Sequence, residues 1–142
     1  MKNTNKNSSL MRAVLSGLIL GPSIMLITSV ILAFAIMKAS NPTGYVFLMA
    51  LTAVFVGGFI SALRAARAYK DSPFQAGLLT GLANLGIIVI VSLISSSYTG
   101  GIWKVLLPPV ILMLASLMGT MTAIRIKPSS KRRLKKLRKQ TR

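Results

Sequence analysis

Long apolar stretches separated by short polar segments dominate the chain. The first runs without a charge from Ala13 to Met37, and its 25 residues exceed the roughly 20 that an α-helix needs to cross a bilayer. Three more occupy about 44–63, 74–97 and 105–124. The segments "SNPTG" and "YTGG", which follow the first and third stretches, are rich in turn-forming residues. The pattern predicts an all-α membrane protein with four transmembrane helices.

Polar segments flank this apolar body at both ends. We expect residues 1–12 to form a basic amino-terminal segment, residues 13–126 the four-helix membrane domain, and residues 127–142 a basic, disordered tail. The tail is too highly charged to fold alone, and its few leucines are insufficient for deep membrane insertion. Removal of the first stretch as a signal peptide is an alternative, but its apolar core is longer than the usual ~7 to 15 residues. We therefore expect it to be retained.

Composition agrees with this pattern and removes most catalytic chemistry. Of the 142 residues, 53% are hydrophobic and 13% are charged, with no His, no Cys and one acid, Asp71. Carboxylate pairs, His-based triads, Cys nucleophiles and the usual metal-ligand sets cannot be assembled from this composition. A Ser/Lys pair would need a desolvated Lys, whereas the lysines lie near span edges or in polar segments. We expect no enzyme activity, no catalytic residue, no cofactor and no metal site.

The positive charges fall mainly on one side of the predicted membrane. Four spans place the amino-terminal segment, the loop that contains Arg64, Arg67 and Lys70, and the tail on the same side. That side holds sixteen Lys and Arg, against Lys38 and Lys104 on the other. By the positive-inside rule, both termini and the central loop are expected in the cytoplasm. So strong a bias also argues against insertion in both orientations.

Basic residues at the cytoplasmic borders are candidates for contact with lipid headgroups. Arg64 and Arg67 are three residues apart and share one face of a helix that extends about a turn beyond the membrane. Their long side chains can reach phosphates, so the main interpretation is an interfacial anchor. An anion or lipid-headgroup site is the alternative. Five tail residues are candidates for the same contact: Lys131, Arg132, Arg133, Lys135 and Lys136.

The segment after these arginines predicts a helix start. Ser72 can be the N-cap, Pro73 suits the first helical position, and Gln75 can reach back to the cap. Asp71 adds negative charge near the positive end of the helix dipole, and it is four residues from Arg67 if the preceding helix continues. The only acid thus lies outside the bilayer, where it is a poor candidate for coupling transport to protons.

Small residues recur at every fourth position in all four apolar stretches. This spacing permits close helix approach and predicts a tight bundle, with self-association left open. The residues that we expect to pack helices together are Gly17, Gly21, Ala53, Gly57, Ser61, Gly77, Gly81 and Gly119. Thr80 and Asn84 share a face of the third stretch and predict interhelical hydrogen bonds. The lining of a path for a polar solute is the alternative role for this pair.

The two halves of the chain resemble each other at two short segments. "SGLILG" at 16–21 matches "AGLLTG" at 76–81, and "GFISALR" at 58–64 matches "GTMTAIR" at 119–125. The nearly constant offset suggests two duplicated helical hairpins in parallel orientation. Chance similarity between low-complexity membrane segments is the alternative.

The segments "GGFISALRA" and "AGLLTGL" on four spans resemble the YrzE-like family of small bacterial membrane proteins from Firmicutes. The turn "KDSPFQ" and the long basic tail depart from that family's pattern. The resemblance implies a multi-pass protein of the bacterial cell membrane with no established activity and no site residues to transfer. We expect a structural or accessory protein that acts through helix contacts and a basic cytoplasmic face. The alternative is a small oligomeric channel, holin or transporter.

The expected partners follow from the same charges and surfaces. Anionic membrane lipids are expected to meet the basic face, and a protein partner or homo-oligomer stays open. Specific nucleic-acid binding is not expected, because no base-reading module or interleaved aromatic residues accompany the basic tail.

Overall fold

Four α-helices make up the described part of the protein. The computed structural model describes residues 2–37, 42–69, 71–94 and 102–126. The helices are α1 (Lys2–Ile36), α2 (Pro42–Ala68), α3 (Pro73–Ile94) and α4 (Ile102–Ile126), and no strand occurs among these residues. Each helix is long and apolar enough to cross a membrane. The predicted all-α class with four spanning helices is confirmed.

Three of the helices, α1, α2 and α4, extend beyond the predicted apolar spans, whereas α3 ends at Ile94 and residues 95–97 of its predicted span lie outside the described residues. The polar residues before Ala13 contain no Pro or Gly, so nothing in them stops the helix, and α1 begins already at Lys2. α2 begins inside the predicted "SNPTG" turn, with Pro42 at a first helical position that does not need its N–H. It continues past Leu63 to Ala68. The "YTGG" segment lies outside the described residues.

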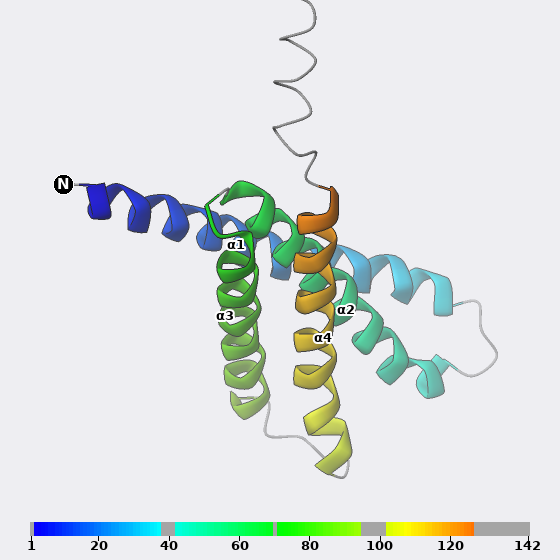
Figure 1. The fold of residues 1–142 in the computed structure, drawn as a ribbon. Coiled ribbons are helices and arrows are strands. Elements are labelled where there is room, and N and C mark those ends of the chain that lie inside the picture. Colours follow the sequence, from blue (N-terminus) through cyan, green and yellow to red (C-terminus); the bar gives the residue numbers. More distant parts are fainter. Residues whose placement is uncertain (1, 38–41, 70, 95–101, 127–142) are drawn as a thin grey trace, which may run out of the picture.

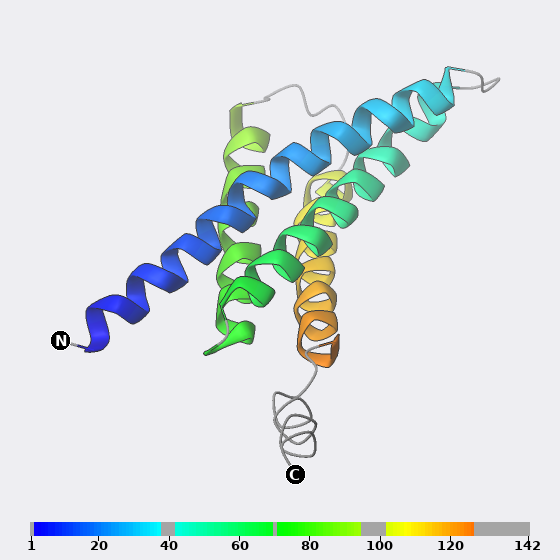
Figure 2. The ribbon, with the colours of Figure 1, turned by 90° about the horizontal axis from the view of Figure 1, so that it is seen from above.

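α2 is the central helix of the fold. It packs against α1, α3 and α4, whereas α1 also packs against α3 but makes no contact with α4 in the described ranges. α3 and α4 run antiparallel, and α1 and α2 form a second antiparallel pair that lies across them (Figure 1). The two pairs diverge toward the ends formed by the last turns of α1 and α3, as the view from above also shows (Figure 2). α1 crosses α3 at Gly17 and Gly21, in the middle part of α1, and its first turns project beyond the other helices (Figure 2).

Burial in the fold is the reverse of that in a water-soluble protein. The buried apolar side chains are mostly alanines, and Leu112 is the largest side chain that is fully buried. Large apolar side chains on all four helices are exposed, among them Ile19, Phe34 and Met118. In lipid these side chains face a medium as apolar as themselves, so close backbone packing of small residues holds the helices together. This is the distribution expected of a multi-pass membrane protein.

Candidate functional site

The first candidate site is the buried junction of α1, α2 and α3. A Cβ atom built onto Gly17 would lie 2.7 Å from Thr80 Cγ2 and 3.0 Å from the carbonyl oxygen of Ser61. One turn later, a Cβ on Gly21 would lie 2.9 Å from Asn84 Nδ2 and 3.2 Å from Ser61 Cβ. The two glycines thus leave the space on α1 that side chains of α2 and α3 occupy.

Asn84 is the most polar side chain at this junction. It is 2% exposed, and its Nδ2 donates a 3.0 Å hydrogen bond to Ser61 Oγ across the α2–α3 interface. Ser61 Oγ in turn donates to the carbonyl oxygen of Gly58 at 3.0 Å. Asn84 Oδ1 accepts no hydrogen bond from the described residues. A buried acceptor without a partner costs on the order of 1–3 kcal/mol, so this amide is only half satisfied.

Thr80 contributes its methyl group rather than its hydroxyl to the junction. Its Oγ1 donates to the carbonyl oxygen of Ala76, one turn earlier in α3, at 2.7 Å. The pair Thr80 and Asn84 therefore shares one buried face of α3, but only Asn84 forms a side-chain hydrogen bond to another helix.

The small residues of α2 form the face that meets α1. Gly57 lies against Met25 and the carbonyl oxygen of Gly21, and Ser61 lies against Gly21. Ala53, earlier on the same face, is also buried. The next position along the chain, Gly58, points to α4 instead, where a Cβ would lie 3.5 Å from that of Ala115. Two adjacent glycines thus allow α2 to contact two helices at one level.

The interfaces of α4 are also formed by glycines that lie against small or polar side chains. Gly77 faces Thr120, and a Cβ on Gly81 would lie 2.5 Å from Ser116 Oγ. Both hydroxyls donate within α4, Thr120 to Ser116 O at 2.7 Å and Ser116 to Met113 O at 2.9 Å. Gly119 brings the α4 backbone against the carbonyl group of Phe59. At these contacts, the small side chains of the α3–α4 and α2–α4 interfaces allow the helices to approach closely. No hydrogen bond between helices is formed at these contacts among the described residues.

The second candidate site lies at the basic end of α2. Arg64 and Arg67 are exposed on its last turns. With Leu63 and Ala68 of the same helix and Ser16 of α1, they line a hollow of about 290 Å³. Neither arginine forms an ion pair within the described ranges. The five candidate tail residues, Lys131, Arg132, Arg133, Lys135 and Lys136, lie outside the described residues.

The link between α2 and α3 differs in detail from the expected arrangement. α2 ends at Ala68, before it could bring Arg67 and Asp71 onto one helical face, and the two form no ion pair in the structure described. Ser72 occupies the N-cap position, because its carbonyl oxygen accepts the Ala76 N–H at 3.3 Å. The side-chain capping bonds expected from Ser72 and Gln75 are not among the hydrogen bonds of the described residues.

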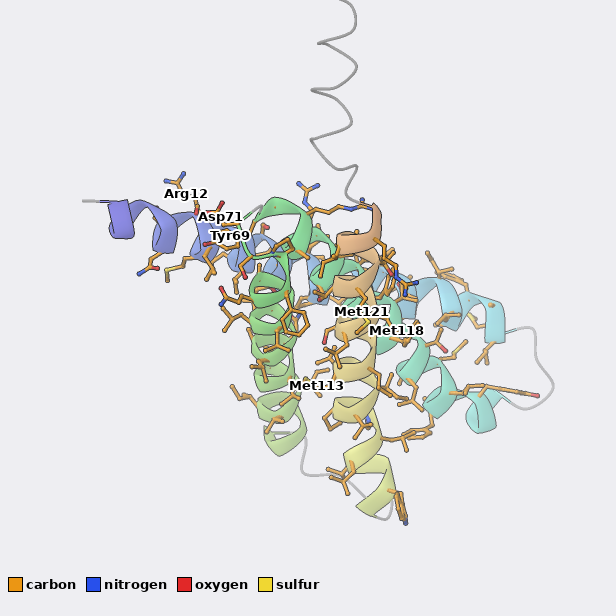
Figure 3. The ribbon with its side chains drawn as sticks, in the orientation of Figure 1. Arg12, Tyr69, Asp71, Met113, Met118 and Met121 are labelled. Atoms are coloured by element: carbon orange, nitrogen blue, oxygen red, sulfur yellow. The ribbon has the colours of Figure 1, made fainter. Side chains whose placement is uncertain are left out.

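Tyr69 is the residue of this link that the sequence reasoning missed. It is 7% exposed and packs with Ala13 and Ala76, next to Leu10, so it joins the beginning of α1 to the beginning of α3. Figure 3 shows Arg12 and Asp71 at the same end of the molecule as Tyr69. From the sequence, an aromatic residue in a basic turn is expected to lie at the membrane interface. Only the burial of Tyr69 in the structure shows that it packs between helices.

Of the other residues that the sequence did not predict, two carry a weak signal in their spacing and one carries none. Ser116 and Thr120 are four residues apart and adjoin Ala115 and Gly119, so their spacing places small polar side chains on one helix face. Ser16 directly precedes Gly17 and has no signal of its own. Its position in the hollow follows from the pairing of α1 with α2.

These features define a class: a four-helix, multi-pass membrane protein whose interior consists of small and polar side chains. The chain belongs to a family described as protein of unknown function (DUF3792), which matches residues 10–123. The match includes parts of all four helices and every interhelical glycine contact described above. No curated protein and no solved structure matches the chain.

Proposed function

We propose that this protein is a structural or accessory component of the bacterial cell membrane and has no catalytic activity. The observation that carries the proposal is that the buried polar side chains form hydrogen bonds within the helix assembly. Each of the buried polar side chains in the described ranges, Ser61, Thr80, Asn84, Ser116 and Thr120, takes part in a hydrogen bond within the helix assembly. Such groups support packing, and the chain offers no acid, His or Cys inside its membrane helices for chemistry.

The proposal includes an orientation with both termini and the α2–α3 link in the cytoplasm. It is supported by the charge count, sixteen basic residues on that side against two on the other. The ends of α2 and α4 and the beginning of α3 lie at one end of the molecule (Figure 1), and Arg67 and Arg125 occupy the last turns of α2 and α4. This end would meet the anionic inner leaflet of the bacterial membrane.

Single cysteines test the orientation, because the natural chain contains none. Gln75→Cys places an exposed thiol at the beginning of α3, and Trp103→Cys places one at the beginning of α4. We expect a membrane-impermeant maleimide to label only the second in intact cells and only the first in inverted vesicles. The reverse pattern, or labelling of both from one side, would contradict the orientation.

The accessory role is tested by affinity purification from cross-linked membranes, followed by mass spectrometry and by flux assays on the purified protein in liposomes. We expect a reproducible membrane-protein partner and no solute flux. An unrelated four-span protein with the same tag serves as the control. Absence of any partner beyond this control would contradict the accessory role.

A second function, transport by an oligomer, is favoured by one observation. The unpartnered Oδ1 of Asn84 is a buried acceptor of the kind that a polar permeant would use. Liposome flux that is lost in both Asn84→Leu and Asn84→Ala, with folding retained, would support transport and overturn the accessory role. Using both variants separates loss of the amide from the crowding that leucine would cause beside Gly21.

A further inference from the structure

The hollow at the basic end of α2 combines a positively charged lining with a recessed volume. Its positively charged lining residues are Arg64 and Arg67, one turn apart on α2. Its volume, about 290 Å³, lies between those side chains and Ser16 of the neighbouring helix α1. The site is thus a partly open recess with two exposed arginines in its lining.

No acidic group of the described residues balances the charge of this recess. The sole acid, Asp71, is not among its lining residues, and neither arginine has an ion-pair partner in the described part of the chain. The carboxyl end of α2 adds roughly half a negative charge, which favours Arg67 there but cannot offset two full positive charges. Guanidinium groups bind phosphate oxygens through paired hydrogen bonds, so a phosphate group fits the chemistry of the recess.

Ser16 shapes the recess without supplying charge. Its hydroxyl donates a 2.8 Å hydrogen bond to the carbonyl oxygen of Ala13 and is therefore already engaged. The small side chain matters because a larger one at this position would enter the space between α1 and α2. We expect the two arginines to determine how strongly a ligand binds in the recess. The small side chains of Ser16 and Ala68 leave the room for that ligand to enter.

The surroundings favour a lipid over a soluble phosphate compound. Leu63 lines the recess, and Ile60 lies one turn deeper in α2 on the face of Arg64. On α1, Ile19 follows Ser16 by three residues and is 69% exposed. An acyl chain attached to a phosphate in the recess would follow these apolar side chains into the bilayer, whereas a soluble phosphate compound would leave them unused.

We propose that this recess binds the phosphate group of one anionic phospholipid per chain. This inference rests on the proposed function, since it names a ligand for the basic end. The recess, formed by Ser16, Leu63, Arg64, Arg67 and Ala68, distinguishes a specific site from general attraction of a basic surface to the inner leaflet.

The test measures lipid retention by the full-length protein. Protein in nanodiscs of phosphatidylcholine with a minor fraction of phosphatidylglycerol is released into detergent, and native mass spectrometry counts the anionic lipids retained. We expect one tightly retained phosphatidylglycerol. Arg64→Gln with Arg67→Gln should remove it and weaken its binding by about tenfold or more, as expected for loss of charged hydrogen bonds.

Two further variants separate the site from its charge. Arg12→Gln with Arg125→Gln removes the same charge from positions outside the recess and should leave the tightly held lipid in place. Ala68→Phe keeps both arginines but adds bulk at an exposed lining position, and it should displace the lipid. Helix content and elution volume confirm that each variant is folded.

Each outcome decides between defined explanations. Equal losses in the two double variants would overturn the site while leaving a basic, lipid-attracting face intact. No preference of the natural chain for phosphatidylglycerol would overturn both the site and the proposed lipid contact. Binding of glycerol 3-phosphate at least as tightly as phosphatidylglycerol would assign the recess to a soluble phosphate compound and overturn the lipid assignment.

Discussion

Gly119 lies where the backbone of α4 touches that of α2. A Cβ atom there would collide with the carbonyl oxygen of Phe59 and lie 3.3 Å from the Leu63 nitrogen, and backbone atoms cannot rotate away as a side chain can. Gly86 of α3 is different, because a Cβ there would meet nothing within 4 Å. The same residue type thus has an essential packing role at one position and none at the other.

Gly119→Ala is therefore expected to destabilise the protein, with Gly86→Ala as the matched control. Overpacking of a close contact lowers the free energy of unfolding by roughly 1–3 kcal/mol. At Gly86 the gain in helix propensity should make the change neutral or stabilising by up to about 1 kcal/mol. Unfolding in mixed detergents, followed by circular dichroism, measures both. Equal effects of the two substitutions would contradict the α2–α4 contact.

Asn84 of α3 and Ser61 of α2 form a hydrogen bond whose contribution to stability a double-mutant cycle can measure. Ser61→Ala removes the partner of a buried amide and should cost about 1 kcal/mol or more. In a cycle with Asn84→Ala, we expect a coupling energy of about 0.6–2 kcal/mol. Thr52→Ala, which removes an exposed hydroxyl bonded within its own helix, should change stability by less than ~0.5 kcal/mol. Additive effects of Ser61→Ala and Asn84→Ala would show that the bond is not formed.

The helix α2 organises the fold because its sides are used by different partners. The face with Gly57 and Ser61 meets α1, while Gly58 meets α4. α1 and α4 consequently lie on different sides of α2 and do not touch within the described ranges. An arrangement of this kind requires small residues on more than one face of the central helix, because each neighbour needs its own close approach.

A disulfide between α2 and α4 tests this arrangement. Gly58→Cys and Ala115→Cys place two Cβ positions 3.5 Å apart, within the range that a disulfide spans, and only the flexible end of Leu112 must shift. Oxidation of membranes should join them within one chain and change its gel mobility until a reductant is added. Ala33→Cys with Ala115→Cys is the control on α1 and α4, and we expect no such bond. Equal crosslinking of both pairs would contradict the packing order.

At the scale of the whole molecule, the described residues form an apolar exterior and an interior of small and polar side chains, and basic residues gather at one end. The large exposed side chains on all four helices match a lipid environment, and the end with Arg64 and Arg67 is where polar headgroups would be met. Stability thus depends on the small interior residues, whereas membrane orientation depends on the summed basic charge and headgroup contact on two of those basic residues, Arg64 and Arg67. A change in one should leave the others largely unaffected.

Orientation should withstand loss of the two recess arginines. Removing Arg64 and Arg67 from the sixteen basic residues on the proposed cytoplasmic side leaves fourteen against two, so the charge bias persists. Arg64→Gln with Arg67→Gln is expected to leave the labelling of Gln75→Cys unchanged while the retained phospholipid is lost. Inverted labelling would mean that these two arginines, rather than the total charge, determine the topology.

Much of this protein could be predicted from the order of its residues alone. Apolar stretches longer than about 20 residues require helices in a membrane, because lipid offers no partners for unpaired backbone groups. The regular spacing of small residues predicts packing positions, and the lack of His, Cys and paired acids limits the possible chemistry. These properties are local or additive, so no knowledge of the fold is needed to derive them.

Only the tertiary structure decided which helices meet, and therefore what the packing positions and arginines face. Periodicity places Gly57 and Gly58 on a helix but cannot choose a partner for each, because many helices offer equally small surfaces. The burial of Tyr69, the unpartnered oxygen of Asn84 and the recess between Ser16 and the arginines all depend on how α1 crosses α2 and α3. Such contacts join residues far apart in the chain, and sequence spacing carries no information about their distance in space.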